Sequence, residues 1–305
     1  NNHGLLQDVT QTSGIAKELG WWNSITAGDF DNDGDIDYIV GNLGLNSFYK
    51  ASEKYPVHIT AAYFDKNGSY DAFPSVYLPT SQEDTTRREY PVHQWEDVNK
   101  QMIGMRAKFA NFRSYAGATM DKLLSPEQLE DALRLTANNF SSVLLRNDGA
   151  RKFSITSLPL PAQVSVLNGI AVNDYNGDGN LDVVINGNDF GTEVSVGRYD
   201  ALNGLLMKGD GKGAFTCAGI LESGIYIPGN GKALVQLRNK EGNLLLAASQ
   251  HNGPLKLFKL KKKERTINLL PGDVSALINY KNGTAQKREC YFGYSFLSQS
   301  GRFLM

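Results

Sequence analysis

The sequence predicts an all-β chain built from repeated antiparallel hairpins, and three observations support this prediction. Asn-Gly pairs, the strongest short-range signal for a hairpin turn, recur between 67–68 and 282–283. An acidic stretch that runs directly into alternating apolar residues occurs near the start of the chain and again further along. Hydrophobic residues make up 41% and charged residues 21% of the 305 residues, which is typical of a soluble globular protein.

The first acidic stretch, GDFDNDGDIDYIVGN at 28–42, places an aspartate at every second position. Like charges crowded in this way repel one another unless a cation neutralises them. The alternate spacing lets the side chains turn toward one point, and Gly34 permits the tight bend that this requires. The candidate metal ligands of this copy are Asp29, Asp31, Asp33, Asp35 and Asp37.

The same spacing recurs in three further copies when the chain is aligned on the glycine of the loop. The second copy offers Asp174, Asn176, Asp178, Asn180 and Asp182. The third has Tyr63 in place of the first aspartate and offers Asp65, Asn67, Ser69 and Asp71. The fourth, around Gly242, has Leu245 in place of the last aspartate and should bind no metal. Internal repeats of this kind are typical of a solenoid, a propeller or an array.

The ligand types favour calcium as the bound ion. Oxygen-only ligation favours Ca²⁺ over zinc or copper, and a flexible cage of many ligands favours it over Mg²⁺. Positions one, three, five and nine would supply side-chain oxygens, and Asp35 or Asn180 a backbone carbonyl. An EF-hand needs Glu at position twelve, where Val40 and Ile185 stand, so the loop should join two strands. The alternative is a solvated acidic turn, which is strongest for the third copy because that copy lacks one ligand.

A helical insertion should interrupt one of the β repeats at about 93–135. Apolar residues recur at helical spacing in HQWEDVNKQMIGMRAKFA. Ser125 and Pro126 are typical of a helix start, and Gln128 completes a capping box. We therefore expect one or two short helices that pack outside the sheets.

Charge and composition exclude several classes of partner. Because 31 basic side chains balance 32 acidic ones, nucleic acid and anionic membranes are not expected partners. No apolar run is long enough to form a transmembrane segment. The two cysteines, Cys217 and Cys290, are too few for a disulfide framework, and whether they pair with each other stays open. The chain opens with Asn1-Asn2-His3 rather than Met, so we expect a trimmed segment of a longer precursor.

The acidic loop followed by an apolar strand resembles the FG-GAP or VCBS repeat of integrin-α-like β-propellers, above all in multi-domain proteins common in Bacteroidetes. The stretches that carry the resemblance include GWWNSITAGDFDNDGD, GNLGLN, NNFSSVLLRNDG and GRYDALNGLLMKGDGKGAF. The end of the chain, YFGYSFLSQSGR, is similar to the tail of an ASPIC/UnbV domain. The resemblance implies propeller repeats over 1–260, with about four blades, and an ASPIC/UnbV-like β segment over 261–305. It also leaves open whether further blades precede this chain.

Two groups of residues are candidates for ligand binding. Trp21 and Trp22 could form an aromatic platform, or one of them could pack between blades. Arg198, Tyr199 and Asp200 stand in a Gly-bounded loop that could bind a ligand or tie two blades together. The four histidines lie far apart in the sequence, so no catalytic residue is assigned.

These observations predict a calcium-stabilised propeller module that binds glycan or protein, or serves as a scaffold. Open loops of this kind bind calcium weakly and need the millimolar calcium found outside cells, so a secreted, periplasmic or outer-membrane location is expected. The alternative is a polysaccharide-active lyase or hydrolase. It would need His251, Arg198 and Tyr199 to converge in one pocket.

Overall fold

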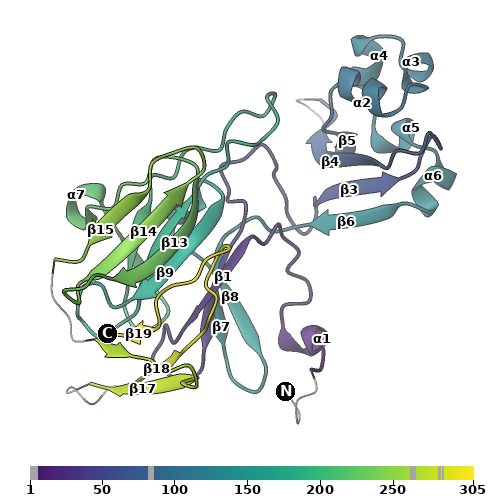
Figure 1. Ribbon diagram of the computed structural model, residues 1–305. Helices are drawn as coiled ribbons and strands as arrows, with labels where there is room; N and C mark the ends of the chain where they lie inside the picture. The colour runs from purple at the N-terminus through teal and green to yellow at the C-terminus, as the bar shows by residue number, and fades with distance from the viewer. Residues whose placement is uncertain (1–5, 82–85, 262–265, 281–282, 284) are drawn as a thin grey trace. The chain divides into compact units, whose positions relative to one another are not determined.

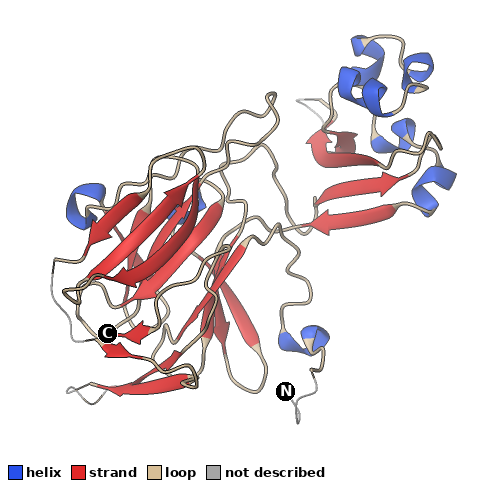
Figure 2. Ribbon diagram, viewed as in Figure 1, coloured by secondary structure: helices blue, strands red, loops and turns tan. Residues whose placement is uncertain are grey.

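The computed structural model describes residues 6–81, 86–261, 266–280, 283 and 285–305, and it confirms the predicted all-β fold (Figure 2). His3 and most of the basic run 261–265 lie outside the described residues. The chain forms two compact units. The first comprises 1–17, 21–48 and 141–305, and the second comprises 18–20 and 49–140.

The first unit contains three successive antiparallel sheets (Figure 1). The first sheet has the order β1-β2-β7-β8 and consists of Ser24–Gly28, Asp37–Gly41, Val143–Asn147 and Phe153–Ser157. The second runs from β9 to β12 and consists of Leu167–Asn173, Asp182–Gly187, Leu205–Gly209 and Phe215–Ala218. The third runs from β13 to β15 and consists of Gly231–Arg238, Leu244–Gln250 and Lys256–Lys259. Each sheet is an up-and-down meander, the strand order found in a propeller blade.

The three sheets pack face to face, with the second sheet in the middle. Val183 and Ile185 of β10 belong to a core shared with the first sheet, while Val184 of the same strand belongs to a core shared with the third. Successive side chains of a strand point to opposite faces, so a strand covered on both sides reads as a continuous apolar run. The first strands of the three sheets are neighbours: β9 lies between β1 and β13 and contacts both (Figure 1).

The remaining elements of the first unit are short. Three helical turns, α1, η1 and α7, span Thr10–Ser13, Leu160–Gln163 and Ile220–Ser223. The C-terminal segment forms two two-stranded ladders, β17-β18 and β16-β19, from Ser275–Asn279, Ala285–Glu289, Ile267–Asn268 and Phe303–Leu304.

The second unit is an insertion between β2 and β7, which pair directly through Tyr38 and Leu145. It has its own sheet of order β5-β4-β3-β6, made of Arg87–Pro91, Asp71–Pro79, Val57–Ala62 and Leu133–Ala137. Five short helices, α2 to α6, span Trp95–Gln101, Met105–Lys108, Phe112–Ala116, Met120–Leu123 and Pro126–Glu130. A core that includes Phe73, Leu123 and Leu124 joins helices and sheet.

The helical residues lie where the apolar spacing placed them, but they form five short helices rather than the expected one or two. The expected capping box at α6 is present. Ser125 Oγ accepts the Gln128 backbone N–H at 3.3 Å, and Gln128 Oε1 accepts the Ser125 N–H at 2.9 Å. Strand β6 begins at Leu133, so the helical part ends slightly before the expected residue 135. The whole insertion is larger than its helices because its own four strands surround them in the sequence. No described helix has the length and apolarity needed to cross a membrane.

Candidate metal-binding loops

Each of the four loop copies connects the two strands of a hairpin, and each hairpin belongs to a different sheet. They link β1 to β2, β3 to β4, β9 to β10 and β13 to β14. Their central glycines, Gly34, Gly68, Gly179 and Gly242, have φ of +91°, +91°, +92° and +83°. A side chain disfavours this left-handed conformation, which explains why glycine stands at the same place in every copy.

In the first loop, three carboxylates gather closely enough to hold one metal ion. Ligand oxygens of Asp29, Asp31 and Asp33 all lie within 4.8 Å of one another. Asp29 is buried, Asp31 is half-buried and Asp33 is exposed, so the cluster opens toward solvent on one side. Burial, followed by the charge of Asp33, raises the pKa of Asp31, as expected for carboxylates that share a site without a cation.

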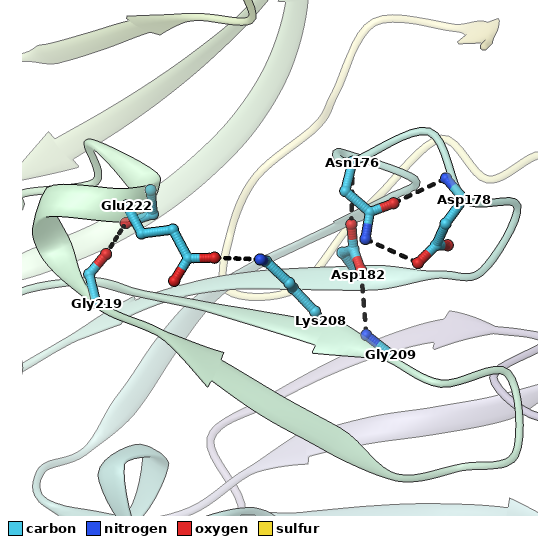
Figure 3. Close-up of polar contacts among 8 residues, drawn as sticks. Asn176, Asp178, Asp182, Lys208, Gly209, Gly219 and Glu222 are labelled. Carbon is cyan, nitrogen blue, oxygen red and sulfur yellow. Dashed lines mark hydrogen bonds and ion pairs between the residues drawn. The ribbon is translucent and has the colours of Figure 1, made fainter.

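Backbone N–H groups of the loop hold these side chains in place. Asp33 accepts the N–H of Asp35 at 2.8 Å, and Asp29 accepts that of Gly34 at 3.4 Å. The second loop repeats this pattern. Asp178 accepts the N–H of Asn180 at 2.8 Å, and Asp174 accepts that of Gly179 at 2.8 Å (Figure 3 shows the loop). Acceptor side chains are thus oriented by the bend itself in both full copies.

The ninth-position aspartates have a different environment, because both are completely buried and brace the hairpin. Asp37 accepts the N–H of Phe30 at 3.0 Å and that of Asn147, on the third strand, at 2.8 Å. Asp182 likewise accepts the N–H of Tyr175 at 2.9 Å. It also accepts the N–H of Gly209 at 3.1 Å, a bond drawn in Figure 3. Asp182 Oδ2 also accepts the N–H of Asn176 at 3.2 Å, so both of its lone pairs are used. Oδ1 of Asp182 and both oxygens of Asp37 each accept one N–H and keep a second lone pair that can contact a cation.

The pKa values of both bracing aspartates are raised. Burial raises the pKa of Asp37 to about 6, and the charges of Asp31 and Asp33 add to the shift. Burial also raises the pKa of Asp182 to about 6, with smaller contributions from Asp178 and Asp174. The backbone N–H groups that each aspartate accepts oppose the shift and hold it near this value.

The third loop lies in the second unit and keeps part of this arrangement. Asp71 is buried, and its Oδ2 has no hydrogen-bond partner among the described residues. Burial, followed by the charge of Asp65, raises its pKa. Tyr63, which stands where the first aspartate would be, is exposed and packs edge-on against Tyr70 at 5.0 Å. This copy therefore offers no ligand at position one.

The fourth loop keeps the bend but has no aspartate at the ligand positions. Asn239 accepts the N–H groups of Glu241 and Asn243 at 3.1 and 2.8 Å. Leu245 takes the place of the ninth aspartate, so no carboxylate braces this hairpin from inside. The backbone turn thus forms from glycine and asparagine alone.

The C-terminal segment contacts both full loops, which no repeat pattern indicated. The backbone N–H of Lys287 donates to Asp29 Oδ2 at 2.9 Å. The fully buried Gln286 donates to Asn32 Oδ1 at 3.0 Å and to the carbonyl of Gly179 at 3.3 Å. Asn32 in turn donates to Asn180 Oδ1 at 3.0 Å, so one hydrogen-bonded chain connects the two loops.

The residues proposed for ligand binding differ in exposure and in their contacts. Trp21 is half-buried and Trp22 is 37% exposed, just before β1. Arg198 lies over the ring of Phe190 at 5.0 Å. Tyr199 is buried, and its backbone pairs with Asp189, so its contacts are structural.

The other predicted polar residues have local contacts. His251 lies on the surface within hydrogen-bond distance of Asn252, at 3.2 Å. Cys217 and Cys290 are free thiols, and burial raises the pKa of both. Among the described residues, no hydrogen bond or ring contact joins His251 to Arg198 or Tyr199.

The chain matches no model of a known protein family, and the search of curated proteins found no match.

The sequence contained two signals that the loop spacing alone did not use. Position two is aromatic in the three acidic copies, as Phe30, Phe64 and Tyr175, and in the two full copies its N–H bonds to the ninth aspartate. The third strand of each sheet also ends with a residue, Asn147 or Gly209, whose N–H donates to the same carboxylate.

Mutations measured in the presence of a chelator should distinguish the buried ninth-position aspartate from the exposed aspartates of the same loop. Asp182→Ala leaves the buried N–H of Gly209 and the partly buried N–H of Tyr175 without an acceptor, and the cost is about 1–3 kcal/mol for a buried group. Asp178→Ala removes an exposed side chain and should change the free energy of unfolding by less than about 0.5 kcal/mol. Urea unfolding in EDTA measures both. Equal losses would contradict the bracing role.

The raised pKa values predict an unusual pH dependence for the metal-free chain. The folded pKa of Asp37 and Asp182 lies near 6, above the ordinary aspartate value, so the folded state binds protons that the unfolded chain does not. Their contribution to stability should therefore rise as the pH falls from 7 toward 5. Thermal melts of the metal-free chain at these pH values measure the change, and Asp37→Asn should reduce it. A wild-type-sized change in Asp37→Asn would contradict the assignment.

Proposed function

We propose that the chain is a calcium-stabilised binding or scaffolding module of the β-propeller type, from a secreted or cell-envelope protein. The observation that carries the proposal is the Asp29, Asp31 and Asp33 cluster, repeated in backbone geometry by the second loop. Each loop would hold one ion through positions one, three, five and nine, and through the carbonyl of Asp35 or Asn180.

Calcium suits these loops better than other common ions. All available ligands are oxygens, which disfavours zinc and copper. The ligands come from one irregular turn and include both exposed and buried carboxylates, whereas Mg²⁺ demands near-ideal octahedral geometry. The third loop, without a ligand at position one, would be a weaker site.

The proposed location follows from the expected affinity. A loop that is open to solvent at Asp33 and supplies its ligands from a short turn should bind weakly, in the range of extracellular calcium modules. Such sites fill only where calcium is millimolar. A role in binding or scaffolding fits blade-like sheets, which present loops at their ends on a rigid frame.

Calcium should raise the melting temperature of the chain, because an ion that binds the folded state at about a hundred times its Kd adds roughly 2.7 kcal/mol per site. EDTA should lower the Tm, calcium should restore it, and magnesium should restore much less. Asp31→Ala should remove about one site's share, since Asp31 accepts only the N–H of Asp33 within its loop.

Glu241→Ala, in the fourth loop, which has no aspartate at the ligand positions, is the matched control and should leave the calcium response intact. A Tm that does not respond to EDTA, together with no calcium by elemental analysis of the purified chain, would return these aspartates to the solvated-turn interpretation.

A further inference from the structure

The second unit contains a groove of about 500 Å³ between the β4–β5 hairpin and helices α4 and α5. A volume of this size is within the range of about 300–1,000 Å³ that is usual for ligand sites. None of the loop aspartates lines it, so it is separate from the proposed metal sites.

One wall of the groove is a face of the hairpin. Leu78 on β4 pairs with Arg88 on β5, and Val76 pairs with Tyr90, so these side chains project from one face. Leu78, Arg88 and Tyr90 line the groove. Pro79 and Pro91 extend this wall with further apolar surface.

The opposite wall comes from α4 and α5, and packing holds it in place. Tyr115 donates its hydroxyl to the carbonyl of His93 at 2.7 Å, and its ring packs edge-on against Phe109 at 5.6 Å. On α5, Leu123 is fully buried, which orients the neighbouring Lys122 toward the surface. The groove is therefore preformed, which reduces the entropy cost of binding.

The groove carries positive charge from both walls. Arg88 and Lys122 are exposed, and neither forms a salt bridge within the described ranges. No carboxylate is among the described residues that line the groove. Asp121 does not line the groove, but its pKa is lowered by Thr119 and, to a smaller extent, by the charge of Arg88. A guanidinium and an ammonium that form no salt bridge favour a ligand that carries carboxylates.

We propose that this groove binds an acidic oligosaccharide, with its sugar rings against Tyr90 and Tyr115 and its carboxylates on Arg88 and Lys122. Aromatic rings and prolines provide the flat apolar surface on which a sugar ring packs. Two cations are too few for nucleic acid, which takes many phosphate contacts. A peptide added to the edge strand β5 would bond to its backbone, whereas the groove is lined by side chains of the hairpin face.

The inference rests on the proposed function in taking the chain as a binding module, and it names a ligand class. Calorimetric titration of the whole chain in calcium buffer tests it with oligogalacturonate, with a neutral maltooligosaccharide and with polyglutamate. We expect binding of oligogalacturonate only. Arg88→Ala and Lys122→Ala should each weaken it about tenfold, the size expected for one hydrogen bond to a charged group.

Arg113→Ala is the matched control, because it removes an exposed cation from α4 that does not line the groove. It should leave the affinity unchanged. Arg88→Lys keeps the charge without the planar fork and should weaken binding less than Arg88→Ala. Unchanged Tm values show that each variant is folded.

The groove proposal is overturned by absence of oligogalacturonate binding, by equal binding of the neutral sugar, or by preference for polyglutamate. Equal losses in Arg88→Ala and Arg113→Ala would also overturn it. The calcium response of the Tm, measured on the same samples, separates failure of this proposal from failure of the metal proposal.

Discussion

The two buried aspartates that end the full loops, Asp37 and Asp182, are the contacts on which each hairpin depends. Each accepts N–H groups from its own loop and from the end of the third strand, so one carboxylate joins three parts of a sheet. A buried carboxylate is costly in the absence of a positive charge, and the pKa near 6 expresses that cost. A cation among the neighbouring carboxylates would remove the repulsion while leaving these hydrogen bonds intact.

The C-terminal segment extends this dependence beyond the hairpins. Gln286 and Lys287 bond to atoms of the two full loops, and Ser295 and Ser300 accept N–H groups from β9 and β13, at Ile170 and Gln236. Residues from the end of the chain thus contact strands and loops of all three sheets in the first unit. The geometry of the acidic loops therefore influences how this segment is held.

Much of the fold followed from the sequence because its signals are local. The spacing of the acidic loop and the glycine at its sixth position predicted four hairpins, and each forms in the structure with the same left-handed glycine. Ser125 and Gln128 likewise specified the start of α6. These features depend on residues within one turn of chain.

The features that sequence reasoning missed depend on residues that are far apart in the chain. The sheet of the second unit pairs β3 with β6, about seventy residues later, and no local pattern specifies that partner. The contact between Lys287 and Asp29, and the groove between Arg88 and Lys122, arise only once distant elements pack together. Long-range pairing of this kind is decided by the whole core.

The central claim is that the crowded aspartates are metal ligands, and a crystal structure grown in calcium tests it most directly. The account predicts one ion in each full loop, about 2.3–2.6 Å from its oxygen ligands. The side-chain ligands would be Asp29, Asp31, Asp33 and Asp37 in the first loop and Asp174, Asn176, Asp178 and Asp182 in the second. The carbonyl of Asp35 or Asn180 would complete each site. Both loops without an ion at saturating calcium, with the aspartates turned out into solvent, would contradict it.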